Sequence, residues 1–154
     1  MVQPASSAAR QALLRGDLEA YQRWFDADGS KAHLIKVATI VNEIDQATSG
    51  RPITFAKLDR PVLNVNTKNL CAYVWMLRTG EQMYHVGSGP RNLVVWKTHA
   101  NEDLRYLAQT MYHGLSHKVG STDDKNYDES TCRGYASNNP AMAVRNAENY
   151  NLFL

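Results

Sequence analysis

Two histidines, His113 and His117, stand four residues apart in the segment YHGLSH at residues 112–117. On a helix, residues at i and i+4 share a face, because each residue turns the chain by about 100°. Two imidazoles placed in this way are a common helical contribution to a catalytic zinc, which takes three protein ligands and leaves one position for water. The spacing predicts a metal-binding helix, with an ordinary pair of solvated surface histidines as the competing interpretation.

An acidic loop follows the histidine pair at once, over residues 120–127 (GSTDDKNY). It leaves the end of the helix and can fold back, so that a carboxylate meets the two imidazoles. Asp123 and Asp124 are the candidates for a third ligand, and a His-His-carboxylate set would hold a zinc ion with its fourth position open. An Asp-rich turn without any metal is the competing interpretation, because Asp is common in turns.

The elements that must position these residues begin with two predicted helices. Apolar side chains recur near helical spacing over residues 7–26 and again over residues 31–48. Gly16 interrupts the first pattern, and the sequence SGRP ends the second. Short β-leaning runs separated by turn residues follow at residues 53–58, 62–65, 72–77 and 83–86. These runs predict a small, antiparallel-leaning sheet.

The helix that would carry the histidine pair begins at about Asn101. Its apolar stripe consists of Leu104, Leu107, Ala108, Met111 and Leu115. This stripe lies on the face opposite the two histidines. After a further loop, a last helix begins at Asn139 and Pro140 and continues past Tyr150. The order of helices, sheet and helices predicts an α+β fold in a single domain over residues 1–154.

Composition limits the classes of protein that the chain could be. Its 17 Lys and Arg against 15 Asp and Glu give a formal net charge of +2, which offers no basis for nucleic-acid binding. No apolar run of about 18 residues predicts a membrane span, and residues 1–15 lack the apolar stretch of a secretory signal. The two cysteines exclude a disulfide framework, while a Cys71–Cys132 bridge and two free thiols are equal alternatives.

Three sequence blocks resemble the deuterolysin and peptidyl-Lys metalloendopeptidase family, the aspzincins. The histidine pair matches the two histidines of the family's HExxH motif, and residues 122–127 (TDDKNY) match its Thr-x-Asp-x-x-Tyr motif. Residues 139–153 (NPAMAVRNAENYNLF) are similar to its terminal NPxxAxxNADNYxxF helix. The resemblance implies a zincin-like metallopeptidase domain that cleaves peptide bonds in a protein or peptide substrate by means of zinc-activated water.

Carried over residue by residue, the resemblance implies roles for five side chains. His113 and His117 would be the first two ligands of Zn²⁺, and Asp124 the third. Tyr127 would donate a hydrogen bond to the oxyanion of the tetrahedral intermediate, and a packed aromatic at a loop end is the alternative. Glu148 falls where the family has an acid that lines the pocket for the residue after the scissile bond. It implies a preference for Lys or Arg there, with a helix surface charge as the alternative.

Gly114 is where the chain departs most from this family, which has Glu directly after the first His. That Glu is the general base, which takes a proton from the attacking water and passes it to the leaving amine. Glycine can do neither, and the loss of a positioned acid–base group typically costs about 10²–10⁴-fold in rate. We therefore expect the chain to bind zinc but to be nearly or wholly inactive. Asp123 is a poor substitute base, because its side chain should diverge from that of Asp124.

Two explanations of Gly114 compete. One is an inactivating replacement in an enzyme whose activity harms its expression host. It suits a toxin or effector domain delivered by a bacterial secretion system without a visible signal peptide, with a cognate inhibitor or immunity protein as partner. The other is a natural pseudopeptidase that acts as a non-catalytic binding module. The first is favoured, since the other site residues are retained. Two further departures are Asp128, where the family usually has Gly, and a short spacing from His117 to Asp124.

Overall fold

The computed structural model describes most of the two helical ends of the chain and three short segments between them. The described residues are 7, 10–11, 13–16, 18–50, 54–57, 72–74, 85–88 and 103–154. The predicted run at 62–65, Asn101 and Cys71 lie outside the described residues, as do the side chains of Leu104 and Leu107. In the part of the chain that is described, no helix combines the length and apolar character that crossing a membrane requires.

Two long helices, α3 (Lys31–Gly50) and α5 (Asp103–Gly120), pack against each other and form the centre of the core. Both carry apolar side chains at helical spacing, which explains why each forms a helix with one buried stripe. The side chains that they bury in this core are Val37, Ile40, Val41, Ile44, Ala108, Met111, Tyr112 and Leu115. The predicted helix over residues 31–48 is therefore confirmed, and so is the described part of the stripe on α5.

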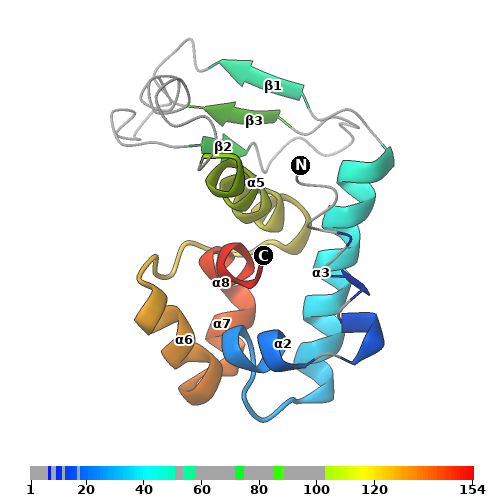
Figure 1. Ribbon diagram of the computed structural model, residues 1–154. Helices are drawn as coiled ribbons and strands as arrows, with labels where there is room; N and C mark the ends of the chain where they lie inside the picture. Colours follow the sequence, from blue (N-terminus) through cyan, green and yellow to red (C-terminus); the bar gives the residue numbers. More distant parts are fainter. Residues whose placement is uncertain are drawn as a thin grey trace.

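A three-stranded sheet lies beside α5, formed by β1 (Thr54–Lys57), β2 (Ala72–Val74) and β3 (His85–Ser88). The middle strand, β3, pairs with β1 in parallel and with β2 in antiparallel orientation. Figure 1 shows the sheet on one side of α5 and the C-terminal helix α8 (Ala147–Phe153) on the other. Much of residues 51–102 lies outside the described residues, so the antiparallel-leaning sheet stays a prediction.

The prediction of one continuous helix over residues 7–26 is wrong. The described residues before Gly16 (7, 10, 11 and 13–15) are helical, Gly16 forms a turn with a φ of 75°, and the chain is helical again in α2 (Glu19–Trp24). A positive φ is easily adopted by glycine alone, which explains why the helix breaks there. Tyr21, at the buried side of α2, and Phe25, just after it, belong to the core.

The turn between α2 and α3 is built around the buried carboxylate of Asp26. This carboxylate accepts hydrogen bonds from the backbone N–H groups of Asp28 and Ser30 at 3.0 and 3.1 Å. His33 Nδ1 lies 2.6 Å from the same side chain. Burial acts to raise the pKa of Asp26, but these hydrogen bonds outweigh it and hold the pKa below its usual value.

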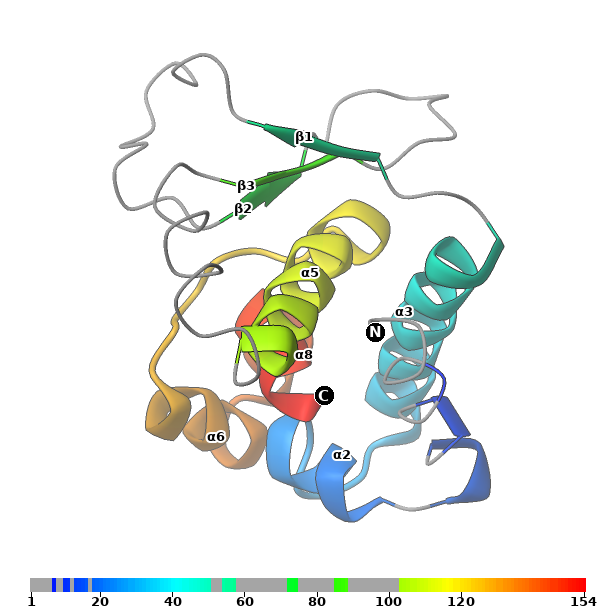
Figure 2. The same cartoon turned by 45° about the horizontal axis from the view of Figure 1, so that its top comes forward.

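The segment before Asn139, for which a loop was predicted, contains helix α6 (Glu129–Asn138). Asp128 begins this helix, because its carboxylate accepts a hydrogen bond from the Thr131 backbone N–H at 2.8 Å. The helix buries only Cys132 and Ala136, which are four residues apart. This apolar signal is too weak to predict a helix from periodicity, although Asp128 is a recognisable N-cap. Figure 2 shows α6 near α2, at the end of the molecule away from the sheet.

The predicted last helix is interrupted at Asn146. It begins as expected, with Asn139 as N-cap and Pro140 in the first turn, but it divides into α7 (Pro140–Arg145) and α8. Asn146 has an extended backbone, with φ −91° and ψ 120°, and forms an isolated parallel bridge with Asp123. This break brings the loop after α5 against the junction of α7 and α8.

Candidate metal centre

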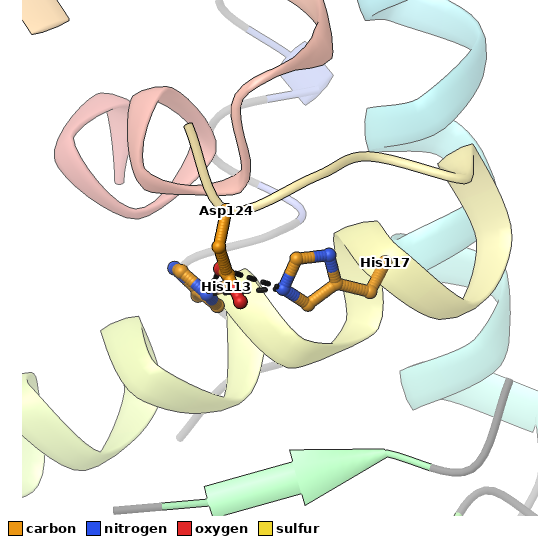
Figure 3. Close-up of side chains that lie close together, drawn as sticks. All are labelled: His113, His117 and Asp124. Carbon is orange, nitrogen blue, oxygen red and sulfur yellow. Dashed lines mark hydrogen bonds and ion pairs between the residues drawn. The ribbon is translucent and has the colours of Figure 1, made fainter. Parts of the chain in front are cut away.

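His113 and His117 of α5 and Asp124 of the following loop direct three donor atoms toward one point (Figure 3). The Nε2 atoms of the two histidines are 3.1 Å apart, and Asp124 Oδ1 lies 3.0 and 3.1 Å from them. Tetrahedral zinc, with bonds of about 2.0–2.1 Å, separates its ligand atoms by roughly 3.3 Å. The three side chains therefore fit a zinc ion in both donor type and spacing.

The two imidazoles are largely enclosed by the protein. The exposed fraction of the side chain is 15% for His113 and 16% for His117, because the loop after α5 and helix α8 cover this face of α5. The interpretation as a solvated surface pair is therefore wrong. Helix α5 has protein on the face that carries the histidines as well as on its apolar stripe.

His117 is oriented by the loop that follows its own helix. Its Nδ1 donates a hydrogen bond to the backbone carbonyl of Thr122 at 2.7 Å. A carbonyl oxygen can only accept, so Nδ1 carries a proton, and the ring is turned so that Nε2 is directed toward Asp124. Thr122 is itself buried, and its hydroxyl lies 2.9 Å from that of the buried Ser116. Sequence reasoning did not assign these roles, although Thr122 begins the motif quoted above.

His113 contacts a carboxylate at each of its two ring nitrogens. Its Nε2 lies 3.0 Å from Asp124 Oδ1, and its Nδ1 lies 3.0 Å from Glu148 Oε2. Burial acts to lower the pKa of His113, but the hydrogen bonds to Asp124 and Glu148 raise it to about 9. The hydrogen bonds from His113 and His117 in turn hold the pKa of Asp124 far below its usual range.

Tyr127 lies at the open side of this site, with an exposed side-chain fraction of 64%. Its ring stacks on the imidazole of His113, with the centroids 5.6 Å apart and the planes at 12°. A hydrogen bond from Tyr127 also contributes to the lowered pKa of Asp124. The structure thus places the phenol beside the ligand group, and its role at an oxyanion stays a prediction.

Asp124 is held in place by backbone pairing of the residue before it. The Asp123 N–H donates to the Arg145 carbonyl at 2.7 Å, and the Ala147 N–H donates to the Asp123 carbonyl at 3.0 Å. The Asp123 side chain leaves the site, since its carboxylate lies 3.0 Å from Lys125 Nζ and 2.9 Å from Arg145 Nη2. Of the two candidate aspartates, Asp124 is therefore brought to the histidines and Asp123 is not.

Asn146 holds the chain on the other side of Asp124. Its side-chain oxygen accepts hydrogen bonds from the backbone N–H groups of Lys125 at 2.9 Å and Asn126 at 3.2 Å. Its amide nitrogen donates to the Asn126 carbonyl and to the Asn149 side chain. Asn146 is fully buried, so this network is a fixed part of the core. Its position in the Asn-rich C-terminal block was the signal that could have identified it.

The comparisons with known proteins agree with this geometry. The family model for lysine-specific metallo-endopeptidases, the aspzincins, matches residues 10–154. The chain belongs to the aspzincin family. Among solved structures it is similar to a zinc peptidase from Grifola frondosa, at 21% identity over 99% of this chain and 90% of that chain, with a TM-score of 0.61. No curated protein matches the chain.

Family membership confirms the resemblance drawn from the three sequence blocks, and the structural likeness confirms the zincin-like fold. Aspzincin peptidases are zinc-dependent, and in this aspzincin His113, His117 and Asp124 are placed where they could hold such an ion. Zinc is therefore its cofactor, and proteins or peptides are the substrates of this family.

The short spacing between His117 and Asp124 does not prevent this aspzincin from assembling the ligand group. The chain reverses immediately after α5 at Ser121, whose φ of 49° lies in the left-handed region. Ser121 N–H donates to the His117 carbonyl at 3.1 Å, which ends the helix tightly. This sharp turn returns the loop to the histidines with few residues. Asp128, the other departure, begins α6 with a φ of −77°, a backbone conformation that needs no glycine.

Gly114 lies buried on α5 between the two histidines of this aspzincin and brings no side chain to the site. Cys132 is a free and buried thiol, and burial raises its pKa to about 11. Its sulfur lies 3.2 Å from the Asn146 amide nitrogen. Of the two alternatives for the cysteines, the free thiol therefore holds for Cys132.

Proposed function

We propose that this chain is a zinc endopeptidase domain that Gly114 has deprived of its general base. The observation that carries this proposal is the intact ligand triangle, with each histidine held by a second hydrogen bond, around a helix position that has no side chain. When bound, zinc supplies an acidified water and polarises the carbonyl of the scissile bond.

The roles of the site residues follow from their places around this centre. His113, His117 and Asp124 would hold the metal. Tyr127 would donate a hydrogen bond from its phenol to the developing oxyanion, a contact worth roughly 3–4 kcal/mol in comparable sites. Gly114 can neither accept a proton nor return one to the leaving amine, so the chain should lose about 10²–10⁴-fold in rate.

A preference for Lys or Arg after the scissile bond is part of this proposal. It is supported by the acidic side chain of Glu148, which lies against His113, and by the lysine-specific description of the family. Peptide mapping of protein digested by a Gly114→Glu variant tests it, because the products should carry Lys or Arg at their new N-termini. Products with unrelated N-terminal residues would refute the preference.

We further propose that the domain is a secreted effector or toxin, delivered by a secretion system and matched by an inhibitor or immunity protein. The support is a peptidase site that lacks only the general base needed for peptide hydrolysis. Such a loss is expected where the activity harms the cell that produces the protein. Induction of Gly114→Glu in a bacterial host should arrest growth, whereas Gly114→Gln should not. Equal growth of the two strains would contradict the proposal.

The second candidate is a natural pseudopeptidase that acts as a binding module, and Gly114 in an otherwise complete site favours it. Casein and a Lys-containing peptide distinguish the two candidates. Gly114→Glu should cleave both when loaded with zinc, while Gly114→Gln, of similar size but without a base, should cleave neither. If Gly114→Glu binds zinc and cuts nothing, the binding module is the better account.

A further inference from the structure

We propose that Glu148 is a positioning residue of the zinc centre, which fixes the ring of His113 so that Nε2 faces the metal. This inference rests on the proposed zinc site and adds to it a residue that does not touch the ion. Glu148 Oε2 lies 3.0 Å from Nδ1 of His113, the ring nitrogen on the far side from Asp124.

Burial makes this contact a strong constraint on the ring. Glu148 has an exposed side-chain fraction of 12% and His113 of 15%, so water competes little for either group. The other carboxylate oxygen, Oε1, accepts a hydrogen bond from the Asn151 side chain at 2.7 Å. Both oxygens of Glu148 are thus engaged, and its side chain is held in one rotamer while it contacts the imidazole.

The helix that carries Glu148 is itself anchored at its neighbouring residues. The buried Asn149 side chain donates hydrogen bonds to the backbone carbonyls of Trp24 and Cys132. The buried Tyr150 hydroxyl donates to the Val144 carbonyl at 3.0 Å. Because α8 is fixed in this way, Glu148 cannot move away from α5 without disturbing the core.

The two histidines are therefore oriented by groups of different charge. His117 donates to a neutral backbone carbonyl that lies close to it in the chain, whereas His113 donates to a carboxylate from a distant helix. A carboxylate behind a ligating imidazole fixes the tautomer and makes the imidazole a better donor to the metal. Removal of such a partner typically lowers metal affinity roughly 10–100-fold.

Zinc affinity of the full chain tests this role without any need for catalysis. Competition against a chromophoric chelator gives the Kd of the protein, of Glu148→Ala and of Glu148→Gln. We expect Glu148→Ala to bind zinc roughly 10–100-fold more weakly. Glu148→Gln keeps a hydrogen-bond acceptor but loses the charge, so its zinc affinity should lie between that of the unchanged protein and that of Glu148→Ala. Glu129→Gln on α6 is the matched control, since it removes the same charge at an exposed site, and its Kd should not change.

Cobalt substitution adds a readout that a purely structural role would not move. The visible absorption bands of bound Co²⁺ report ligand geometry, so they should shift in Glu148→Gln and stay unchanged in Glu129→Gln. Asn151→Ala releases Glu148 without touching the histidine, and it should weaken zinc binding in the same direction by a smaller factor. This second variant keeps the test decisive if Glu148→Ala does not fold.

The outcomes separate this inference from the proposed function. If the protein binds zinc and the Glu148 and Asn151 variants bind it equally well, Glu148 has no positioning role and the inference is overturned. If the protein with its natural Glu148 binds no zinc at all, the metal site itself is refuted, and the inference falls with it.

Discussion

Asp123 and Asn146 form a parallel backbone bridge, although they belong to distant parts of the chain. The bridge fixes the residue immediately before Asp124. The Asn146 side chain accepts hydrogen bonds from the backbone N–H groups of the two residues that follow Asp124. Asp124, the proposed third metal ligand, is therefore held between two anchors on the α7–α8 junction. The histidines are held by the helical hydrogen bonds of α5, and the loop is held by the hydrogen bonds of this junction.

Substitution of Asn146 should destabilise both the fold and the metal site. In Asn146→Ala the buried amide is lost and backbone groups of the Asp124 loop lose their partners, at a cost of about 1–3 kcal/mol in the free energy of unfolding. Zinc affinity should fall as well, because Asp124 loses one of its anchors. Urea denaturation and chelator competition measure the two effects. Asn138→Ala, at an exposed site on α6, is the control, and equal behaviour of the two variants would contradict the anchor.

Zinc should raise the melting temperature of the protein. A ligand at 100 times its Kd stabilises the folded state by about 2.7 kcal/mol, which corresponds to roughly 5–10 °C for a chain of this size. Differential scanning calorimetry with and without a chelator measures the shift. Asp124→Ala should show a much smaller shift, because one ligand is missing. A melting temperature that ignores both zinc and chelator would exclude the metal centre.

The close approach of α5 to α3 predicts that Gly120→Ala is destabilising. A Cβ at Gly120 would lie 2.7 Å from Ile40 Cδ1 and 2.9 Å from its Cγ1, and Ile40 is buried. We expect a loss of about 1–3 kcal/mol, because overpacked cores must shift. Gly134→Ala on α6 is the matched control, since its Cβ would meet nothing within 4 Å, and it should be neutral or stabilising. Adding Ile40→Val to Gly120→Ala should restore part of the loss, and no recovery would show that this contact is not the cause.

Asp26 should make the protein sensitive to acid. Its pKa is lower in the folded than in the unfolded chain, where Asp titrates near 3.9, so it stabilises the fold above about pH 4 and less as the pH falls further. Asp26→Asn removes this contribution and should lower the free energy of unfolding near neutral pH by roughly 1–3 kcal/mol. The difference in free energy of unfolding between Asp26→Asn and the unchanged protein should become smaller as the pH is lowered toward about 3. A difference that is constant with pH would rule out the ionised carboxylate as the source.

Helix α3 and the ligand group could be predicted from the sequence because they depend on local spacing. The stripe from Val37 to Ile44 repeats at helical period. The acidic turn is near the two histidines in the chain, so their proximity could be predicted, although the contacts that hold the turn in place could not. The break at Gly16 was visible as a glycine, but its left-handed backbone was not.

The supports of the site could not be predicted in the same way. The contacts of Glu148 with His113 and of Asn146 with the Asp124 loop join segments that only the tertiary fold brings together. Periodicity carries no information on such pairs. Helix α6 was missed for a related reason, since it is stabilised by the Asp128 cap and by two buried side chains rather than by a continuous apolar stripe.

The reliance of Asp124 and His113 on residues 145–148 sets an order of events during protein synthesis. The ribosome delivers both histidines and the aspartate before it delivers the segment that anchors them. We therefore expect a nascent chain to offer zinc only a loose pair of imidazoles, and to bind it tightly once helix α8 has docked. On this expectation metallation follows the closure of the helical core rather than guiding it.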